Sequence, residues 1–275
     1  MRPARQRVWL GEDAYTGDGL RGNAIAPLIP SHGVVRVGSQ DVAMSYHRQH
    51  ILSPHYRHRD RMSKKSQDLI PLLDYLRIHR VIRSVLDSAG AHTAHACWFF
   101  SMAGAAILRH HYHKEAHPLA GAMCLMADEK KSNVLCFASI ENDEVQSSET
   151  GFHAMVVCDD HVVDFMSPLF PETSKSAKHD FITPAKSFQR RIDTMTTSPA
   201  DLKKDGDFFF DPNMQLTDHL ELKVAQSLFQ KDVINACVAW YVRPPKPIPA
   251  WVVMGDPKEG GSKVTLKEAS VIGAW

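Results

Sequence analysis

Three residues of different types, in the order Cys97, His153 and Asp164, could together make an activated thiol nucleophile. Cys97 stands where a polar loop enters an apolar segment, so the free N–H groups and the dipole of a helix beginning there would stabilise a thiolate. His153 is a titratable ring inside an otherwise apolar run, Phe152 to Val157. The order of nucleophile, base and orienting carboxylate predicts acyl-transfer chemistry.

Two expected strands would bring the histidine and the aspartate together. Residues 152–158 and 161–165 have the pattern of a hairpin that turns at Asp159-Asp160. In that register His153 lies opposite residue 166, and Asp164 is its diagonal neighbour on the same face. The carboxylate could then accept a hydrogen bond from one imidazole nitrogen while the other nitrogen faces Cys97.

The apolar periodicity of the chain predicts an α+β domain around these residues. The expected elements are, in order, a helix from Asp68 to a terminal Gly90, a buried helix over 97–113, strands at 120–127 and 133–140, the 152–158/161–165 hairpin, helices within 216–229 and 232–242, and a hairpin of 250–254 with 264–266. Residues 167–205 are rich in Pro, Ser and Lys and show one short apolar piece near Phe181. Helices before and after an antiparallel sheet are typical of the α+β class.

The N-terminal region differs from the rest of the chain. Residues 1–64 lack sustained periodicity and are rich in Gly, Arg and His, which predicts an irregular or weakly ordered extension before a single domain over 65–275. We hypothesise that Met62 is the true start and that residues 1–61 are upstream sequence. The extension has an excess of basic residues that could contact nucleic acid or anionic lipid, but we favour a solvated arm.

The composition argues against several classes of protein. With 44% hydrophobic residues, 23% charged residues and a net charge of +1, the chain is typical of a folded globular protein and has no overall charge for binding nucleic acid. The longest near-apolar run, Ala96 to Leu108, is shorter than the ~20 residues of a membrane span. We find no signal peptide and no phosphate-binding glycine motif.

The five cysteines are widely spaced and include no C-x-x-C pair. This spacing favours reduced thiols in a cytoplasmic protein over a disulfide framework or a cysteine zinc site. Core packing is the expected role of the cysteines other than Cys97, which are Cys124, Cys136, Cys158 and Cys237.

The residues around the three candidate groups resemble the papain-like cysteine peptidase superfamily. Cys97-Trp-Phe-Phe-Ser101 looks like the C-W-x-F-S run at the nucleophile of these peptidases, and Phe152-His-Ala-Met-Val-Val157 looks like their H-A-V histidine strand. Asp164 is more like the Cys-His-Asp relatives, the transglutaminase-like proteins and arylamine N-acetyltransferases. The resemblance, over about residues 91–168, implies a papain-like fold in which a central helix bearing the cysteine packs on an antiparallel sheet bearing the histidine and the aspartate.

Other features bear on this resemblance. Papain-like enzymes carry a Gln for the oxyanion hole six residues before the nucleophile, where this chain has Ala91, and the usual C-G-S before the nucleophile is absent. The backbone N–H of Cys97 would be one oxyanion donor. The candidates for a second donor are His92, Thr93 and His95. The C-terminal run Val271-Ile-Gly-Ala-Trp275 is similar to that of a small uncharacterised bacterial family within the superfamily.

The resemblance implies a thiol-dependent acyl-transfer enzyme, either an amide or peptide hydrolase or an acyltransferase. Cys97 would attack a carbonyl, His153 would take the thiol proton and later protonate the leaving group, and Asp164 would orient the ring. We expect a peptide or small amide substrate, no cofactor or metal, no nucleic-acid or membrane partner and a cytoplasmic location. The sequence leaves the substrate and the oligomeric state open.

Two other classes of function stay open. A catalytically silent papain-like binding module would keep the fold, and Ala91 in place of Gln favours it. A metal-dependent hydrolase or sensor would use histidines instead, although the Glu of the zinc-protease motif is missing. The histidines in question are His47, His50, His110, His113 and His117. Each member of the Cys-His-Asp set also has a simpler interpretation as a packing residue.

Overall fold

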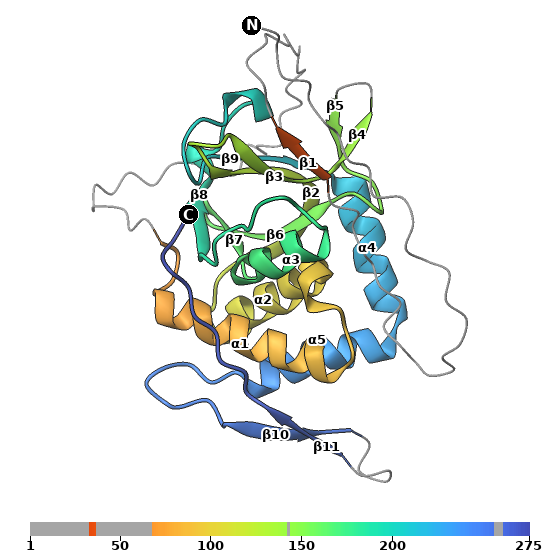
Figure 1. The fold of residues 1–275 in the computed structure, drawn as a ribbon. Coiled ribbons are helices and arrows are strands. Elements are labelled where there is room, and N and C mark those ends of the chain that lie inside the picture. The colour runs from red at the N-terminus through yellow and green to blue at the C-terminus, as the bar shows by residue number, and fades with distance from the viewer. Residues whose placement is uncertain (1–32, 37–67, 142–143, 256–260) are drawn as a thin grey trace, which may run out of the picture.

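The computed structural model describes residues 33–36, 68–141, 144–255 and 261–275, and within them five α-helices pack on a curled antiparallel sheet (Figure 1). The helices are α1 (Leu72–Ser88), α2 (Cys97–Tyr112), α3 (Phe170–Ser176), α4 (Met214–Gln226) and α5 (Leu228–Trp240). The strands are β1 (Gly33–Arg36), β2 (Ala116–Asp128), β3 (Asn133–Phe137), β4 (Ser139–Glu141), β5 (Glu144–Gln146), β6 (His153–Cys158), β7 (His161–Asp164), β8 (Phe188–Arg191), β9 (Phe208–Pro212), β10 (Trp251–Met254) and β11 (Ser262–Thr265). The α+β class predicted from the sequence is therefore correct.

The main sheet has the strand order β1-β3-β2-β6-β7-β8, and β9 also pairs with β2. The long strand β2 pairs with β6 through its first half and with β9 through its second half, and both partners are antiparallel to it. Gly121 lies where the two pairings meet, and a Cβ atom there would approach the carbonyl oxygen of Asp211 to 2.2 Å. Glycine is thus required for β9 to reach this edge.

Helix α2 is the centre of the fold. It packs on β2 and β6 on one side and on α1 and α5 on the other, which explains why its sequence is apolar nearly all round. Gly104 of α2 makes room for the ring of Phe165, because a Cβ atom there would lie 2.3 Å from Cδ2 of that ring. The prediction of a buried helix beginning near Cys97 is confirmed.

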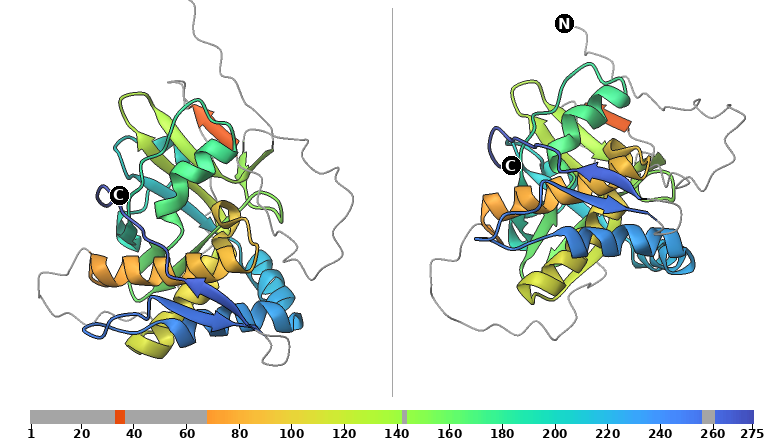
Figure 2. Two further views of the ribbon diagram at one scale, coloured as in Figure 1. Left: turned by 60° about the horizontal axis from the view of Figure 1, so that its bottom comes forward. Right: turned by 90° about the horizontal axis from the view of Figure 1, so that it is seen from below.

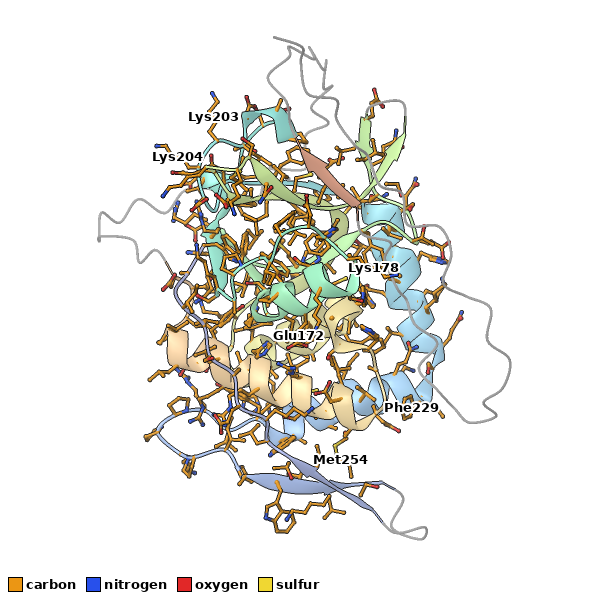
Figure 3. The ribbon with its side chains drawn as sticks, viewed as in Figure 1. Glu172, Lys178, Lys203, Lys204, Phe229 and Met254 are labelled. Carbon is orange, nitrogen blue, oxygen red and sulfur yellow. The ribbon has the colours of Figure 1, made fainter. Side chains whose placement is uncertain are left out.

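Side chains on β2 and β3 divide between the two faces of the sheet. The side chains of one face pack against α2. Those of the other face form, with residues from neighbouring segments, a smaller group of buried residues that we call the second core. Its members are Ala122, Cys124, Met126, Val134, Cys136, Ala138, Val145, Leu202 and Phe209. Lys203 and Lys204, which follow the core residue Leu202 in the chain, are exposed to solvent (Figure 3). The sheet is therefore buried on both faces along β2 and β3.

The β10–β11 hairpin lies against the helical layer, on the side away from the main sheet (Figures 1 and 2). Both its strands and the two C-terminal helices overlap the predicted ranges, although α5 begins at Leu228 rather than at the predicted residue 232. None of the described helices is long and apolar enough to cross a membrane.

Four parts of the structure go beyond the predicted elements, and one of them is β9, for which the sequence analysis predicted no strand. The stretch 167–205 contains α3 and β8, although its composition suggested neither. The acidic stretch 141–150 contains β5, which forms a hairpin with β4. From the N-terminal extension, β1 pairs with β3 at the edge of the sheet, and the rest of residues 1–64, including His47 and His50, lies outside the described residues.

Candidate active site

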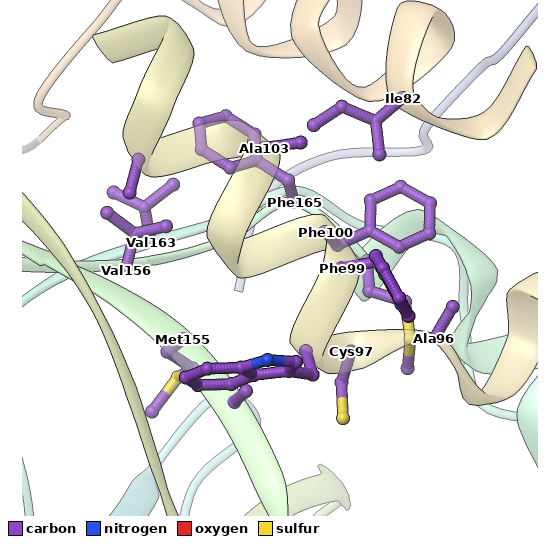
Figure 4. Packing of buried hydrophobic residues seen from close by; sticks show 14 of the residues in the cluster. Ile82, Ala96, Cys97, Phe99, Phe100, Ala103, Met155, Val156, Val163 and Phe165 are labelled. Atoms are coloured by element: carbon purple, nitrogen blue, oxygen red, sulfur yellow. The ribbon is translucent and has the colours of Figure 1, made fainter. Parts of the chain in front are cut away.

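Cys97 is the first residue of α2, directly after Ala96 and the short 3₁₀ turn Thr93–His95. Its side chain is 1% exposed and points away from Phe100 and Ile82 (Figure 4). The residue at the N-cap, Ala96, has no polar side chain that could occupy the N–H groups of the first turn. The helix dipole and these donors therefore act on the cysteine sulfur and on any oxygen that develops charge beside it.

His153 begins β6 and lies opposite Gly121 of β2. It is 0% exposed, and its Nε2 donates a hydrogen bond of 2.8 Å to Oδ2 of Asp164. The rings of Phe137 and Phe170 lie against the imidazole, with centroid distances of 4.3 and 5.9 Å. The histidine is thus held by one carboxylate inside an aromatic wall.

Asp164 ends β7 and is 1% exposed. Its second oxygen, Oδ1, accepts a hydrogen bond of 2.8 Å from the backbone N–H of Met166, and its own carbonyl oxygen accepts one of 2.5 Å from the Tyr75 hydroxyl. Because both carboxylate oxygens have donors, the side chain has one orientation, and that orientation faces His153.

Burial by itself lowers the pKa of His153, but the carboxylate of Asp164 and the thiol of Cys97 more than reverse this and raise it to about 9. Of the residues that raise the pKa of His153, Cys97 comes after Asp164 in the size of its effect. Since Nε2 is engaged by Asp164, the nitrogen left for the thiol is Nδ1, which makes no hydrogen bond of normal geometry within the described residues. The ring can therefore receive a proton at Nδ1 while Asp164 stabilises the resulting imidazolium.

The three candidates for a second oxyanion donor lie just before Cys97, and the contacts given below for them are with other residues. The hydroxyl of Thr93 donates to Oδ1 of Asp87 at 2.9 Å, and Nε2 of His95 lies 2.8 Å from Oγ of Ser176. The ring of His92 is 4.5 Å from that of His95 and is exposed. Burial and the neighbouring His92 lower the pKa of His95 to about 4. The structure places these residues just before Cys97 in the chain.

Sequence reasoning missed the residues that pack around His153 and Asp164 from other elements. Phe137 of β3 and Phe170 of α3 form the wall around His153, and His79 of α1 donates from Nδ1 to the carbonyl oxygen of Phe165 at 2.7 Å. Tyr75 and His79 are one helical turn apart, so α1 contacts two successive carbonyls at the end of β7, those of Asp164 and Phe165. The sequence signal that could have indicated this role is the presence of a tyrosine and a histidine on the buried face of a helix.

The histidines considered for a metal site are dispersed. His110 and His113 are exposed at the end of α2, and His117 is exposed on β2. Over 33–36, 68–141, 144–255 and 261–275, no group of three or more His, Cys, Asp or Glu side chains is arranged to hold a metal ion.

Comparison with known proteins identifies relatives of this chain. A protein-family model described as "Protein of unknown function (DUF2026)" matches residues 71–275. A solved structure described as "The crystal structure of genomics APC5867" is 31% identical with a TM-score of 0.68, and the match covers 78% of this chain and 100% of that chain. No curated protein matches the sequence. The chain belongs to the DUF2026 family of proteins of unknown function.

Proposed function

We propose that this protein is a thiol-dependent acyl-transfer enzyme of papain-like fold, with Cys97 as nucleophile, His153 as base and Asp164 as the residue that orients the base. The observation that carries the proposal is the buried His153–Asp164 hydrogen bond of 2.8 Å beside a cysteine at the start of a helix. If His153 and Asp164 had only a packing role, apolar side chains would serve as well, because removing the two charges of a buried ion pair from water is costly.

The proposed reaction needs only the groups described above. Nδ1 of His153 holds the proton of the Cys97 thiol, so that the ring is an imidazolium, and the thiolate sulfur forms a bond to the carbonyl carbon of an amide. The N–H groups of the first turn of α2 stabilise the oxyanion. His153 then returns the proton to the amine as the C–N bond breaks, which leaves an acyl thioester on Cys97.

The second half of the reaction decides the type of enzyme. Attack by water on the thioester regenerates the thiol and releases an acid, whereas attack by an amine transfers the acyl group. Because Cys97 and His153 are buried, we propose a small amide or an extended peptide as the substrate rather than a bulky one. The five free cysteines fit the reducing environment of the cytoplasm, which we propose as the location.

Trapping the acyl-enzyme tests the proposal against a silent binding module. The full chain is mixed with p-nitrophenyl acetate, an activated ester, and the protein is quenched in acid and analysed by peptide mass spectrometry. We expect one acetyl group, on Cys97, with none on Cys158, another buried cysteine. Cys158→Ser serves as the matched control and should keep the acetylation that Cys97→Ser loses. A wild-type protein without acetyl-Cys97 would favour the silent module.

A further inference from the structure

Cys124 and Cys136 form a second pair of thiols, separate from the proposed catalytic site. Cys124 on β2 and Cys136 on β3 are directly opposite each other in the antiparallel register. Both belong to the second core, on the face of the sheet opposite α2, and they are 2% and 1% exposed. Their side chains thus point to the same side of two hydrogen-bonded strands.

The backbone hydrogen bonds decide how close the two residues are. In an antiparallel sheet each residue directs both its N–H and its C=O to the same neighbouring strand. Met126 directs both to the β9 side, because its N–H donates to Asp207 and its carbonyl accepts from Gly206, each at 2.9 Å. Cys124, two residues earlier, also turns its backbone toward β9, where it pairs with Phe209.

Cys124 and Cys136 are therefore a non-hydrogen-bonded pair, in which the Cα atoms are ~4.5 Å apart and the side chains closest. Disulfides form at Cα separations of ~4.4–6.8 Å, so a bond between these sulfurs requires little backbone movement. A hydrogen bond that the Cys124 thiol donates to Cys136, together with burial, raises the pKa of Cys124, in keeping with neighbouring sulfurs.

We propose that Cys124 and Cys136 are a dithiol site that a small-molecule disulfide oxidises to a cross-strand disulfide. The thiolate of one cysteine attacks the oxidant and releases one thiol, which leaves a mixed disulfide. The facing cysteine then attacks its neighbour's sulfur and releases the second thiol. Two electrons pass to the oxidant, and the two protons of the cysteine thiols end on the two released thiols.

The bond would tie β2 to β3 behind the proposed active site. Phe137, next to Cys136 along β3, faces the opposite side and lies against the ring of His153. Oxidation would thus fix the strand that carries this aromatic wall while Cys97, on the other face, stays a thiol. Because both sulfurs are buried, the reaction requires local opening of the strands, and because it needs a thiolate, its rate rises with pH.

Oxidation of the full-length protein with oxidised glutathione tests the proposal. After quenching with an alkylating agent in denaturant, digestion should yield a peptide that links Cys124 to Cys136, formed faster at pH 9 than at pH 7, by about tenfold per pH unit while the thiols remain un-ionised. Reduction with dithiothreitol should remove the link. Absence of the linked peptide, or a wild-type protein in which both cysteines stop at mixed disulfides with glutathione, would overturn it.

Single substitutions make the test specific. In Cys124→Ser or Cys136→Ser the remaining cysteine has no facing partner, so a mixed disulfide with glutathione should accumulate there. Cys158→Ser and Cys97→Ser are the matched controls and should leave the link unchanged. A loss of the link in either control would show that the thiols exchange through another cysteine, and the direct pairing would be wrong. The test does not depend on acyl-transfer activity.

Discussion

Replacing Asp164 with Asn removes the negative charge that holds His153 while keeping the shape of the side chain. In the wild type, Oδ2 accepts the 2.8 Å hydrogen bond from Nε2 of His153, and Oδ1 accepts one of 2.8 Å from the Met166 N–H. The variant can keep the second contact but not the ion pair. The expected loss is therefore electrostatic, and it has a characteristic dependence on pH.

The magnitude follows from the pKa of His153, which rises from its ordinary value of 6.5 to about 9 in the folded protein. Each unit is worth about 1.36 kcal/mol, so the site stabilises the fold by about 3 kcal/mol when His153 is protonated in both the folded and the unfolded chain. That stabilisation is complete below pH 6.5, declines as the pH rises, and is lost above pH 9.

In Asp164→Asn the raising effect of the carboxylate on the pKa of His153 is lost, and of the two residues that raised it only Cys97 remains. Burial, the largest single influence, then disfavours the charged ring. The imidazole is then neutral in the folded variant near pH 7, so it causes no such decline in the free energy of unfolding. Urea unfolding between pH 6 and pH 9.5 should show the wild type losing about 3 kcal/mol more than the variant over this range. Asp160→Asn, which removes a half-exposed carboxylate from the same hairpin, should keep the wild-type slope. Parallel profiles for wild type and Asp164→Asn would refute the reasoning.

Other substitutions test the parts around the triad. Tyr75→Phe removes the hydrogen bond to the Asp164 carbonyl, so it should lower the free energy of unfolding by about 1 kcal/mol and slow alkylation of Cys97, and no change in either would contradict a positioning role. Gly104→Ala places a methyl group 2.3 Å from the Phe165 ring and should cost about 1–3 kcal/mol in urea unfolding, whereas an unchanged midpoint would show that the core has room. A chain starting at Met62 should melt within a few degrees of the full chain in calorimetry, and a much larger drop would show that the extension stabilises the sheet.

The central geometry follows from local sequence signals. The turn at Asp159-Asp160 sets the register of β6 and β7, and the predicted pairing is observed, with Val156 opposite Val163 and Cys158 opposite His161. The apolar segment after residue 96 begins a helix at Cys97, as predicted. Short-range rules sufficed here because a two-residue turn and a helix start depend on neighbouring residues.

The supports of the site depend on contacts between distant segments and were not predictable from local patterns. Helix α3 has seven residues, too few to be stable alone, and it is held where Thr173 donates to the Ala94 carbonyl at 2.8 Å. Strand β8 places the buried Phe188 in the core despite polar neighbours in the sequence. In both cases tertiary packing outweighs a composition that suggests a loop.

The rate of Cys97 alkylation by iodoacetamide against pH, in wild type, His153→Ala and His161→Ala, tests the triad most directly. His161 is a buried histidine of the same hairpin that pairs with Asp160, so its replacement controls for general disturbance of the sheet. With His153 as the base, wild type and His161→Ala should react at pH 6–7 at least about tenfold faster than His153→Ala, and all curves should converge at high pH as thiols ionise unaided. Coincident curves for wild type and His153→Ala across the whole range would show that the histidine does not activate Cys97.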